Sequence, residues 1–194
     1  MVYSAMVRFG RLLKKVRLKL FNHGILVGEN TIIDYKTVII NKMSVIKLGK
    51  NVYLRSNAKG YQAGMPFPTT LLADVKGALI EIGDNCRVNG AYIHAQKSIK
   101  IGSNCVIASG VNILDTNGHE LYSYDRTVNR DSPEEVVIGN NVWIGLNAII
   151  LKGTVIGDNA VVSAGSIVKG TFEPNSLIVG NPAKTVKILN IPQA

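Results

Sequence analysis

Hydrophobic residues recur at every sixth position along the second half of the chain. The aliphatic positions are Ile138, Ile144, Ile150, Ile156, Val162 and Val168. Slim residues follow four places later, at Val142, Ala148, Thr154, Ala160 and Ser166. An α-helix repeats its apolar face about every 3.6 residues and a strand about every 2, so neither has this period. A six-residue unit instead predicts a short strand and a tight turn. Three such units would close one triangular coil with the aliphatic side chains stacked inside, which is a parallel β-helix in the all-β class.

Glycines mark the predicted corners of the coils, where a positive φ or the close approach of two backbones excludes a Cβ. They are Gly139, Gly145, Gly153, Gly157 and Gly165. The same period begins at Val27 and is broken twice, over residues 59–74 and 114–135. We expect both stretches to be excursion loops that leave the column.

Both ends of the chain are predicted to depart from the repeat. Over residues 1–23, apolar residues recur in steps of three and four, which predicts an amphipathic helix with a basic opposite face. We expect this helix to cap the β-helix or to pack on a neighbouring molecule. Contact with a membrane surface stays open as the alternative. The β-helix domain would span residues 24–190. Its last coil would end near Val168, with Pro174 and Pro182 stopping the repeat before a terminal strand and tail.

Composition narrows the class of protein. The chain has 194 residues, of which 46% are hydrophobic, and this suits one domain with an appendage. The net charge is +9, but residues 1–23 carry six basic residues and no acidic one. A β-helix without interleaved aromatic residues offers bases no stacking platform, so we expect no nucleic acid partner. Neither a long uncharged apolar stretch nor a signal peptide is recognisable. We therefore expect a cytoplasmic protein, at the inner face of the membrane if the N-terminal helix binds lipid.

The two cysteines fit the repeat. Cys86 and Cys105 each lie four places after an aliphatic residue, Ile82 and Ile101, one coil apart. This is the slim inward position, so we expect packed thiols rather than a disulfide or a metal pair.

Three histidines are the candidate bases. His23 lies beside the basic helix, His94 in a coil with one extra residue, and His119 in the second interruption. We expect His94 to be an ordinary half-buried side chain. His119 lies in a polar loop between two well-phased coils, which is a common place for chemistry. From spacing alone, a simply exposed histidine is an equally good interpretation.

Three motifs favour a catalytic role for His119. The runs SGVNILDTNGHE, VVIGNNVWIG and VGNPAKTVKI, together with the repeat, resemble the hexapeptide-repeat O-acetyltransferases that modify galactosides, maltose and surface polysaccharides. The resemblance covers about residues 80–190 and implies a left-handed coil, an exception to the right-handed crossover rule. It also implies that His119 is the general base and that Asn89 helps to hold the acceptor. By the same resemblance, Trp143 lies beside the cofactor or acceptor, and Lys184 approaches the phosphates of coenzyme A.

The residue types suit acetyl transfer from acetyl-CoA to a sugar hydroxyl. A neutral imidazole can take the hydroxyl proton as the oxygen attacks the thioester, and the activated thioester requires neither a metal nor a covalent enzyme intermediate. We expect the backbone N–H groups of Gly145 and Leu146 to stabilise the oxyanion. Ala164 and Gly165 would leave room for the pantetheine arm.

The chain departs from the family pattern at several positions. Leu146 stands where some members carry a serine able to donate to the oxyanion, so only its backbone could do so. Lys169 precedes Gly170 where the family has Thr-Lys, which moves a phosphate-binding charge by one residue. No N-terminal acceptor-binding segment typical of the galactoside and maltose enzymes is recognisable, so the acceptor stays open.

An O-acetyltransferase acting on a sugar or polysaccharide precursor is the leading hypothesis. N-acetylation of an amino sugar and a non-catalytic scaffold stay open as alternatives. A γ-type carbonic anhydrase needs three zinc-binding histidines, two of them at short spacing, whereas His94 and His119 are 25 residues apart. We expect a homotrimer with active sites between subunits, because six or seven coils at ~4.8 Å each make a short column with flat faces.

Overall fold

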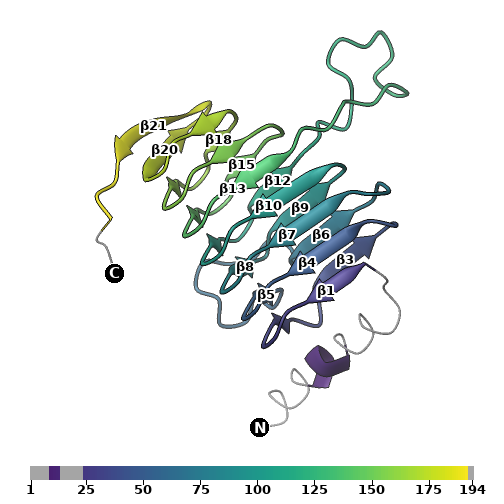
Figure 1. Cartoon of the computed structure of the whole chain (residues 1–194), viewed down its shortest axis with the longest axis vertical. Coiled ribbons are helices and arrows are strands. Elements are labelled where there is room, and N and C mark those ends of the chain that lie inside the picture. Colours follow the sequence, from purple (N-terminus) through teal and green to yellow (C-terminus); the bar gives the residue numbers. More distant parts are fainter. Residues whose placement is uncertain (1–8, 14–23, 192–194) are drawn as a thin grey trace.

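The computed structural model describes residues 9–13 and 24–191, and it is a column of stacked coils made of short strands (Figure 1). Each full coil contributes one strand to each of three sheets, A, B and C, so a strand pairs with the strand three places away in the sequence. Sheet A contains β1 (Ile25–Val27), β4 (Val45–Leu48), β7 (Leu79–Ile82), β10 (Ser98–Ile101), β13 (Val136–Ile138), β16 (Val155–Ile156) and β19 (Thr171–Phe172).

The other two sheets have the same construction. Sheet B contains β2 (Ile32–Ile33), β5 (Tyr53–Arg55), β8 (Arg87–Asn89), β11 (Val106–Ile107), β14 (Trp143–Ile144), β17 (Val161–Val162), β20 (Ser176–Gly180) and β21 (Ala183–Ile188). Sheet C contains β3 (Val38–Asn41), β6 (Thr70–Ala73), β9 (Tyr92–Ala95), β12 (Asn112–Leu114), β15 (Ile149–Ile150) and β18 (Ile167–Val168). Among the described residues, only β20 and β21 pair antiparallel. The predicted parallel β-helix is confirmed.

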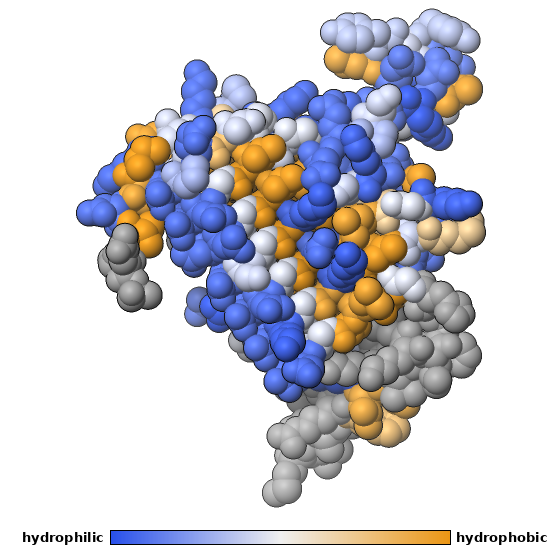
Figure 2. Space-filling model, viewed as in Figure 1, coloured by the Kyte–Doolittle hydropathy of each residue, from blue (hydrophilic) through white to orange (hydrophobic). Residues whose placement is uncertain are grey.

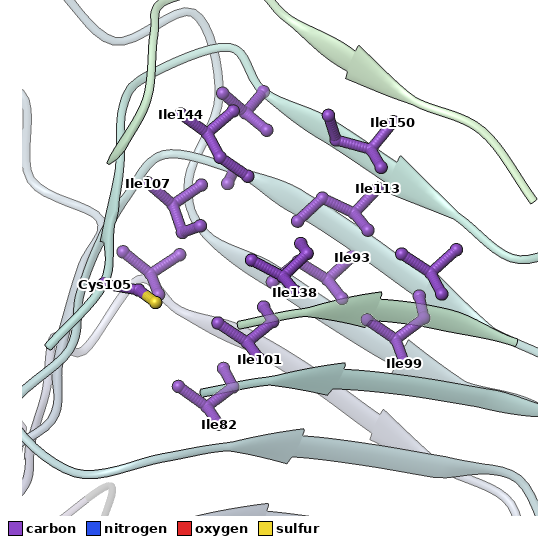
Figure 3. Close-up of a cluster of buried hydrophobic side chains, with 14 of the residues drawn as sticks. Ile82, Ile93, Ile99, Ile101, Cys105, Ile107, Ile113, Ile138, Ile144 and Ile150 are labelled. Atoms are coloured by element: carbon purple, nitrogen blue, oxygen red, sulfur yellow. The ribbon is translucent and has the colours of Figure 1, made fainter. Parts of the chain in front are cut away.

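The aliphatic residues of the repeat point into the column and form its core. The six in-phase residues from Ile138 to Val168 are each at most 2% exposed, and they stack in register, as Ile138 does on Ile156. Figure 3 shows isoleucines from all three sheets converging on one interior. Burial of each contributes about 1.5–3 kcal/mol. A coil buries this surface only against its neighbours, so the column is stable as a stack.

Slim residues fill the inward positions beside the corners. Cys86 and Cys105 are buried free thiols in the core, as predicted. The hydrogen bond with Cys105 and burial raise the pKa of the Cys86 thiol, so it is protonated at neutral pH. Thr154 is also buried, and it donates its hydroxyl to the carbonyl of Val168 at 3.2 Å. A polar side chain is tolerated at this position because it bonds to the backbone of the next coil.

Glycine and asparagine shape the corners. A Cβ on Gly145 would lie 2.6 Å from the nitrogen of Ala164 in the next coil, so only glycine fits. A second corner device, which the sequence prediction missed, is a set of asparagines with positive φ, a conformation that asparagine adopts more readily than other residues with a Cβ. It includes Asn51, Asn85, Asn104, Asn141 and Asn159. Their side chains bond from coil to coil, as Asn141 Nδ2 does to Asn159 Oδ1 at 2.9 Å.

The two interruptions of the repeat differ from each other. The second forms a loop over residues 115–135 between β12 and β13, as predicted (Figure 1). The first was predicted as a loop over residues 59–74, and the second half of that prediction is wrong because Thr70–Ala73 form β6. Leu71 is fully buried there. Counting in sixes failed because the inserted loop shifts the phase of the strand that follows it.

The C-terminal end of the repeat also differs from the prediction. Phe172 and Ile178 are only 8% and 0% exposed, so the coil continues beyond Val168. Pro174 lies in a corner between β19 and β20 and does not stop the repeat. The reversal comes at Pro182, after which β21 folds back antiparallel on β20.

Arg11 ties the start of the chain to the first coils. Residues 9–13 are helical, and the rest of the helix predicted over residues 1–23 lies outside the described residues. The Arg11 guanidinium lies 2.6 Å from the carboxylate of fully buried Asp34 and donates to the Tyr53 hydroxyl at 2.8 Å. An arginine thus compensates a buried charge at this end of the column.

The apolar residues of the same helical turn face away from the column. Phe9, Leu12 and Leu13 are 63%, 60% and 53% exposed. None of the helical residues described here forms a segment with the length and hydropathy needed to cross a membrane. The turn therefore contacts the column through its polar side and presents an apolar side to its surroundings.

Candidate active site

The predicted site residues fall at two of the three corners of the coil. The turn after each sheet B strand is named the B–C corner, and the turn after each sheet C strand the C–A corner. At the B–C corner or on the adjoining face of sheet B lie Asn89, Trp143, Gly145, Leu146, Ala164, Gly165 and Lys184. His119 and Lys169 lie at the C–A corner. One chain therefore does not bring His119 to Asn89, because sheet C lies between the two corners.

The loop that carries His119 is anchored at both ends. Asp115 is fully buried where the loop begins, and its carboxylate accepts three backbone N–H groups, from residues 96–98, at 2.7–2.8 Å. Where the loop ends, Lys152 Nζ donates to Asp131 Oδ1 at 2.8 Å. Polar groups that are bonded in this way hold the two ends of the loop on neighbouring coils.

The charge pair at the second anchor shifts two pKa values. Burial acts to raise the pKa of Asp131, but hydrogen bonds from Lys152 and from the Asn117 N–H outweigh it and lower the pKa overall. The hydrogen bond to Asp131 raises the pKa of Lys152 against the opposing effect of burial, with a further contribution from Glu134. Both groups are charged at neutral pH as a result.

His119 is exposed, and one of its ring nitrogens is already engaged. Nδ1 contacts the backbone carbonyl of Arg126, and Arg130 Nη1 lies 3.1 Å from the same nitrogen. A carbonyl can only accept a hydrogen bond and a guanidinium can only donate one, so these two contacts favour opposite tautomers and do not assign the ring proton. Both contacts lie at Nδ1, and Nε2 has no hydrogen-bond partner among the residues that the structure describes. The tautomer with its lone pair on Nε2 can act as a general base.

The tip of the same loop presents large side chains to solvent. Tyr122 and Tyr124 are 93% and 98% exposed, and Leu121 and Val128 are 64% and 67% exposed. Figure 2 shows the loop standing clear of the column at the upper right, with hydrophobic patches among hydrophilic surface. Exposed apolar groups gathered in this way are typical of a surface that contacts a partner.

Asn89 ends β8 at the B–C corner and is 7% exposed. Its Nδ2 donates to the carbonyl of Ile107 in the next coil at 3.0 Å, which fixes the orientation of the carboxamide. Its Oδ1 accepts no hydrogen bond from the residues that the structure describes. The side chain is therefore oriented, with one acceptor atom left over.

The two predicted oxyanion donors are not equally available. The Gly145 N–H donates to the carbonyl of Val162 at 2.8 Å, so it belongs to the ladder between coils. The Leu146 N–H makes no hydrogen bond within the described part of the chain, whereas the Leu146 carbonyl accepts the Gly165 N–H at 2.8 Å. Of the pair, only Leu146 can offer a backbone donor to a ligand.

The other predicted cofactor residues are accessible. Trp143 is 54% exposed on the outer face of sheet B, and Ala164 is exposed at the next B–C corner. A Cβ on Gly165 would meet no atom within 4 Å, so this corner is open. Lys184 is exposed on β21, whereas exposed Lys169 lies at the C–A corner. Four of the five therefore follow one edge of the column, which suits an extended pantetheine chain.

A hollow of about 300 Å³ lies beside the B–C corner. Its lining consists of Phe67, Thr70, Tyr92 and Asn112. The last three occupy paired positions on β6, β9 and β12. Burial and the nearby Asp74 charge raise the pKa of Tyr92, so its hydroxyl stays protonated. Beside the hollow, His94 is half-buried, as expected, and its Nε2 lies 2.9 Å from Asp74 Oδ1.

Comparison with known proteins identifies the family. The family described as "hexapeptide repeat of succinyl-transferase" matches residues 80–114 and 135–169. The polysialic acid O-acetyltransferase of Neisseria meningitidis is 33% identical over 144 residues, which cover 64% of this chain and 67% of that protein. The chain belongs to the hexapeptide-repeat acyltransferases.

Other members agree with this membership. The galactoside O-acetyltransferase of Escherichia coli strain K12 is 36% identical over 115 residues, or 59% of this chain and 56% of that enzyme. The chain thus spans little more than half of that relative's length. A solved galactoside acetyltransferase in complex with coenzyme A superposes with a TM-score of 0.56 at 24% identity, over 94% of this chain and 82% of that one.

A second solved structure has a similar fold. AntD, an N-acyltransferase from Bacillus cereus in complex with dTDP and 3-hydroxybutyryl-CoA, superposes with a TM-score of 0.68 at 20% identity, over 91% of this chain and 88% of that one. Structural likeness to the hexapeptide-repeat acetyltransferases supports the left-handed coil that the sequence resemblance implied. The described residues hold no group of three His, Cys, Asp or Glu side chains placed to bind a metal ion.

Sequence reasoning missed the residues around the first interruption. Arg55 ends β5 directly beside Asn89 in the sheet B ladder, and Tyr61 and Phe67 lie in the loop that follows it. The signal that could have identified them is an arginine followed by aromatic residues in a loop next to a predicted site. The prediction favours the second interruption because it is the one that carries a histidine.

Proposed function

We propose that this hexapeptide-repeat acyltransferase moves an acetyl group from acetyl-CoA to a hydroxyl of a sugar in a surface polysaccharide or its precursor. The observation that carries the proposal is the placement of His119, an exposed imidazole held through Nδ1 in a loop that is anchored at both ends. Relatives named as O-acetyltransferases of polysialic acid and of galactosides support a saccharide acceptor. The complex of galactoside acetyltransferase with coenzyme A supports the donor.

The proposed reaction uses His119 as a general base. Nε2 takes the acceptor's hydroxyl proton while the oxygen attacks the thioester carbonyl carbon, forming the new C–O bond. The Leu146 N–H is the donor to the oxyanion that develops. When the intermediate collapses, the C–S bond breaks and the imidazolium gives its proton to the leaving thiolate. Asn89 orients the acceptor, and Trp143 and Lys184 bind the cofactor along the edge of the column.

We propose that the working enzyme is a homotrimer with sites between subunits. His119 and Asn89 lie at different corners with sheet C between them, so a neighbouring chain has to bring one to the other. A three-fold arrangement places the C–A corner of one chain against the B–C corner of the next. The exposed apolar tip of the loop, with Tyr122 and Tyr124, supports such a contact. Lys169 would then face the neighbour's cofactor edge.

We propose that the N-terminal segment contacts an anionic membrane surface. The support is the outward orientation of Phe9, Leu12 and Leu13, together with the five basic residues besides Arg11, and no acidic residue, in residues 1–23. Basic amphipathic segments bind anionic interfaces through these two kinds of group. The cytoplasmic location expected from the sequence stays a prediction.

An acceptor screen tests the proposed function. The protein is incubated with acetyl-CoA and either an oligosaccharide that has only hydroxyl groups or an amino sugar, and the released thiol is measured. We expect release with the hydroxyl acceptor, and a product that mild alkali cleaves because it is an ester. Release only with the amino sugar, giving an alkali-stable amide, would favour the N-acetyltransferase alternative. No release with any acceptor would contradict acetyl transfer.

A further inference from the structure

A half-buried arginine without a counter-ion lies beside Asn89. Arg55 ends β5, and its backbone pairs with Asn89 in the neighbouring coil of sheet B. The guanidinium carbon lies 5.1 Å from the centre of the Tyr53 ring and 5.5 Å from that of Tyr61. Tyr53 comes from the same strand, and Tyr61 comes from the loop of the first interruption. The two rings hold the guanidinium in place through cation–π contacts.

One nitrogen of this guanidinium is not satisfied within the described chain. Its Nε is buried and has no hydrogen-bond partner, and no described carboxylate forms an ion pair with Arg55. Asp34, which contacts the residue after Arg55, is already engaged, because it binds Arg11 through Oδ1 and accepts the Ser56 N–H through Oδ2. A partly desolvated cation in this state is costly unless a ligand supplies the missing negative charge.

The surroundings of Arg55 are themselves positively charged. Arg87 occupies the position next to Tyr53 in the following coil, and the guanidinium carbon of Arg11 lies 5.4 Å from the centre of the Tyr53 ring. Three arginines thus lie around Tyr53 on this face of sheet B, and of the three only Arg11 forms an ion pair with a described carboxylate, that of Asp34. A guanidinium presents parallel N–H donors that match the oxygens of a phosphate or carboxylate group.

We propose that Arg55 binds an oxyanion on the acceptor, either a phosphate or a carboxylate, and so selects an acidic saccharide. The inference rests on the proposed function, because Asn89 is taken as the residue that holds the acceptor. The anion would lie one coil from Asn89, a step of about 4.8 Å along the column. A phosphate would belong to a sugar carried on a nucleotide or lipid diphosphate, and a carboxylate to an acidic sugar ring. A neutral sugar would make no use of the unpaired charge.

Calorimetry with three probes tests the proposal: thymidine diphosphate, methyl glucuronide and methyl glucoside. The titrations are carried out with saturating coenzyme A, so that its own phosphate site is filled. We expect at least one of the two acidic probes to bind the wild-type protein, and the one that binds identifies the source of the oxyanion. In Arg55→Gln its affinity should fall about 10- to 100-fold, as loss of a charged hydrogen bond predicts.

Lys76→Gln is the matched control. Lys76 is exposed at the C–A corner of the same coil, so this variant loses the same charge away from the proposed site. Its affinity for the acidic probe should stay within about twofold of wild type. If Arg55→Gln proves unstable, Arg55→Lys keeps the charge but not the forked geometry and should still bind several-fold more weakly.

Three results would overturn the assignment of Arg55. The first is that neither acidic probe binds the wild-type protein. The second is that Arg55→Gln and Lys76→Gln lose equal affinity for the acidic probe. The third is that Arg55→Gln loses as much affinity for methyl glucoside as for the acidic probe. Coenzyme A affinity is measured separately on the same wild-type sample. If coenzyme A did not bind, this would count against the proposed acetyl transfer. The binding of the acidic probes would still decide whether Arg55 holds an oxyanion.

Discussion

The imidazole of His119 is held by its surroundings in the loop. The Arg126 carbonyl and the Arg130 guanidinium both contact Nδ1, and exposure of the ring leaves Nε2 accessible to an acceptor. His94, the other histidine of the folded column, has its Nε2 occupied by Asp74. The two histidines therefore differ in which ring nitrogen is engaged, and of the two only His119 lies in the loop that projects from the column (Figure 1).

Replacement of His119 tests the assignment of the base. His119→Ala should lower kcat with a hydroxyl acceptor by about 10²–10⁴, because proton removal matters in the transition state. Affinity for acetyl-CoA should be nearly unchanged, since the ring is not needed to bind the cofactor. His94→Ala is the matched control and should keep most of the wild-type kcat. The assignment fails if His119→Ala keeps most of the rate, and His94 would then be the next candidate.

Individual residues show how far the sequence could predict the molecule. The six-residue period placed Ile138 and its in-phase partners correctly in the core, because stacking of identical coils leaves one inward position per strand. It misplaced β6, because an insertion of arbitrary length between Arg55 and Thr70 resets the count. The role of Arg55 was not predictable, since its significance depends on Tyr61 folding back from a loop and on the absence of a described counter-ion.

The candidate site was predictable only as a set of residues. The motifs singled out His119 and Asn89, but a linear repeat count does not show that they occupy different corners. The sequence also does not show which backbone N–H groups are free to bind a ligand. Gly145 and Leu146 are adjacent in the sequence, yet only the Gly145 N–H is used by the ladder between coils. Hydrogen bonding between coils is a property of the stacked structure, so it had to be read from the structure.

The excursion loop over residues 115–135 works as an element because its ends are fixed. Asp115 bonds to the backbone of the preceding corner, and the Asp131–Lys152 pair secures the other end. Lys152 also lies 3.1 Å from Glu134. These anchors allow an exposed loop to hold His119 in a defined position relative to the column.

Loss of the Lys152 anchor should loosen the loop. Lys152→Gln should lower the free energy of loop opening by about 1.5–3 kcal/mol, the usual contribution of a charged hydrogen bond, and speed amide hydrogen exchange over residues 115–135. Exchange in the strands of the column should be unchanged. Lys100→Gln removes a more exposed pair, with Glu135, and should have a much smaller effect. Equal effects of the two substitutions would contradict the anchoring role.

The same anchor should weaken in acid. The folded-state pKa of Asp131 lies below its ordinary value of 3.8, so its pairing stabilises the loop fully above that value and is lost as the pH falls through the lower folded-state pKa. Loop exchange, corrected for its intrinsic pH dependence, should therefore accelerate below about pH 4 in the wild type. In Asp131→Asn this acceleration should disappear. An unchanged acid profile in that variant would assign the effect to another group.

The N-terminal turn is a second element whose contribution can be measured. Arg11→Ala leaves the buried Asp34 carboxylate without its cation and should destabilise the fold by about 1.5–3 kcal/mol in denaturant unfolding. Lys36→Ala, an exposed residue nearby, should change stability by less than about 0.5 kcal/mol. Turnover on a small soluble acceptor should be kept in both variants. A stable but inactive Arg11→Ala protein would instead place this turn in the active site.

At the scale of the whole molecule, the column alone does not complete the proposed site. Asn89 and the cofactor edge belong to the B–C corner, and His119 belongs to the C–A corner of the same chain. A closed three-fold assembly joins the two kinds of corner at every subunit boundary and leaves no unpaired corner. The account therefore predicts the mass of three chains in light scattering at micromolar concentration. A monomer would remove the shared site.

Complementation between two inactive variants tests the shared site most directly. His119→Ala and Asn89→Ala are each expected to be nearly inactive alone. When they are coexpressed in equal amounts and assemble at random, about one boundary in four should join an intact His119 to an intact Asn89. Acetyl transfer by the mixture should then reach about one quarter of the wild-type rate. A mixture no more active than its two parents would contradict the account, because each chain would then need both residues for its own site.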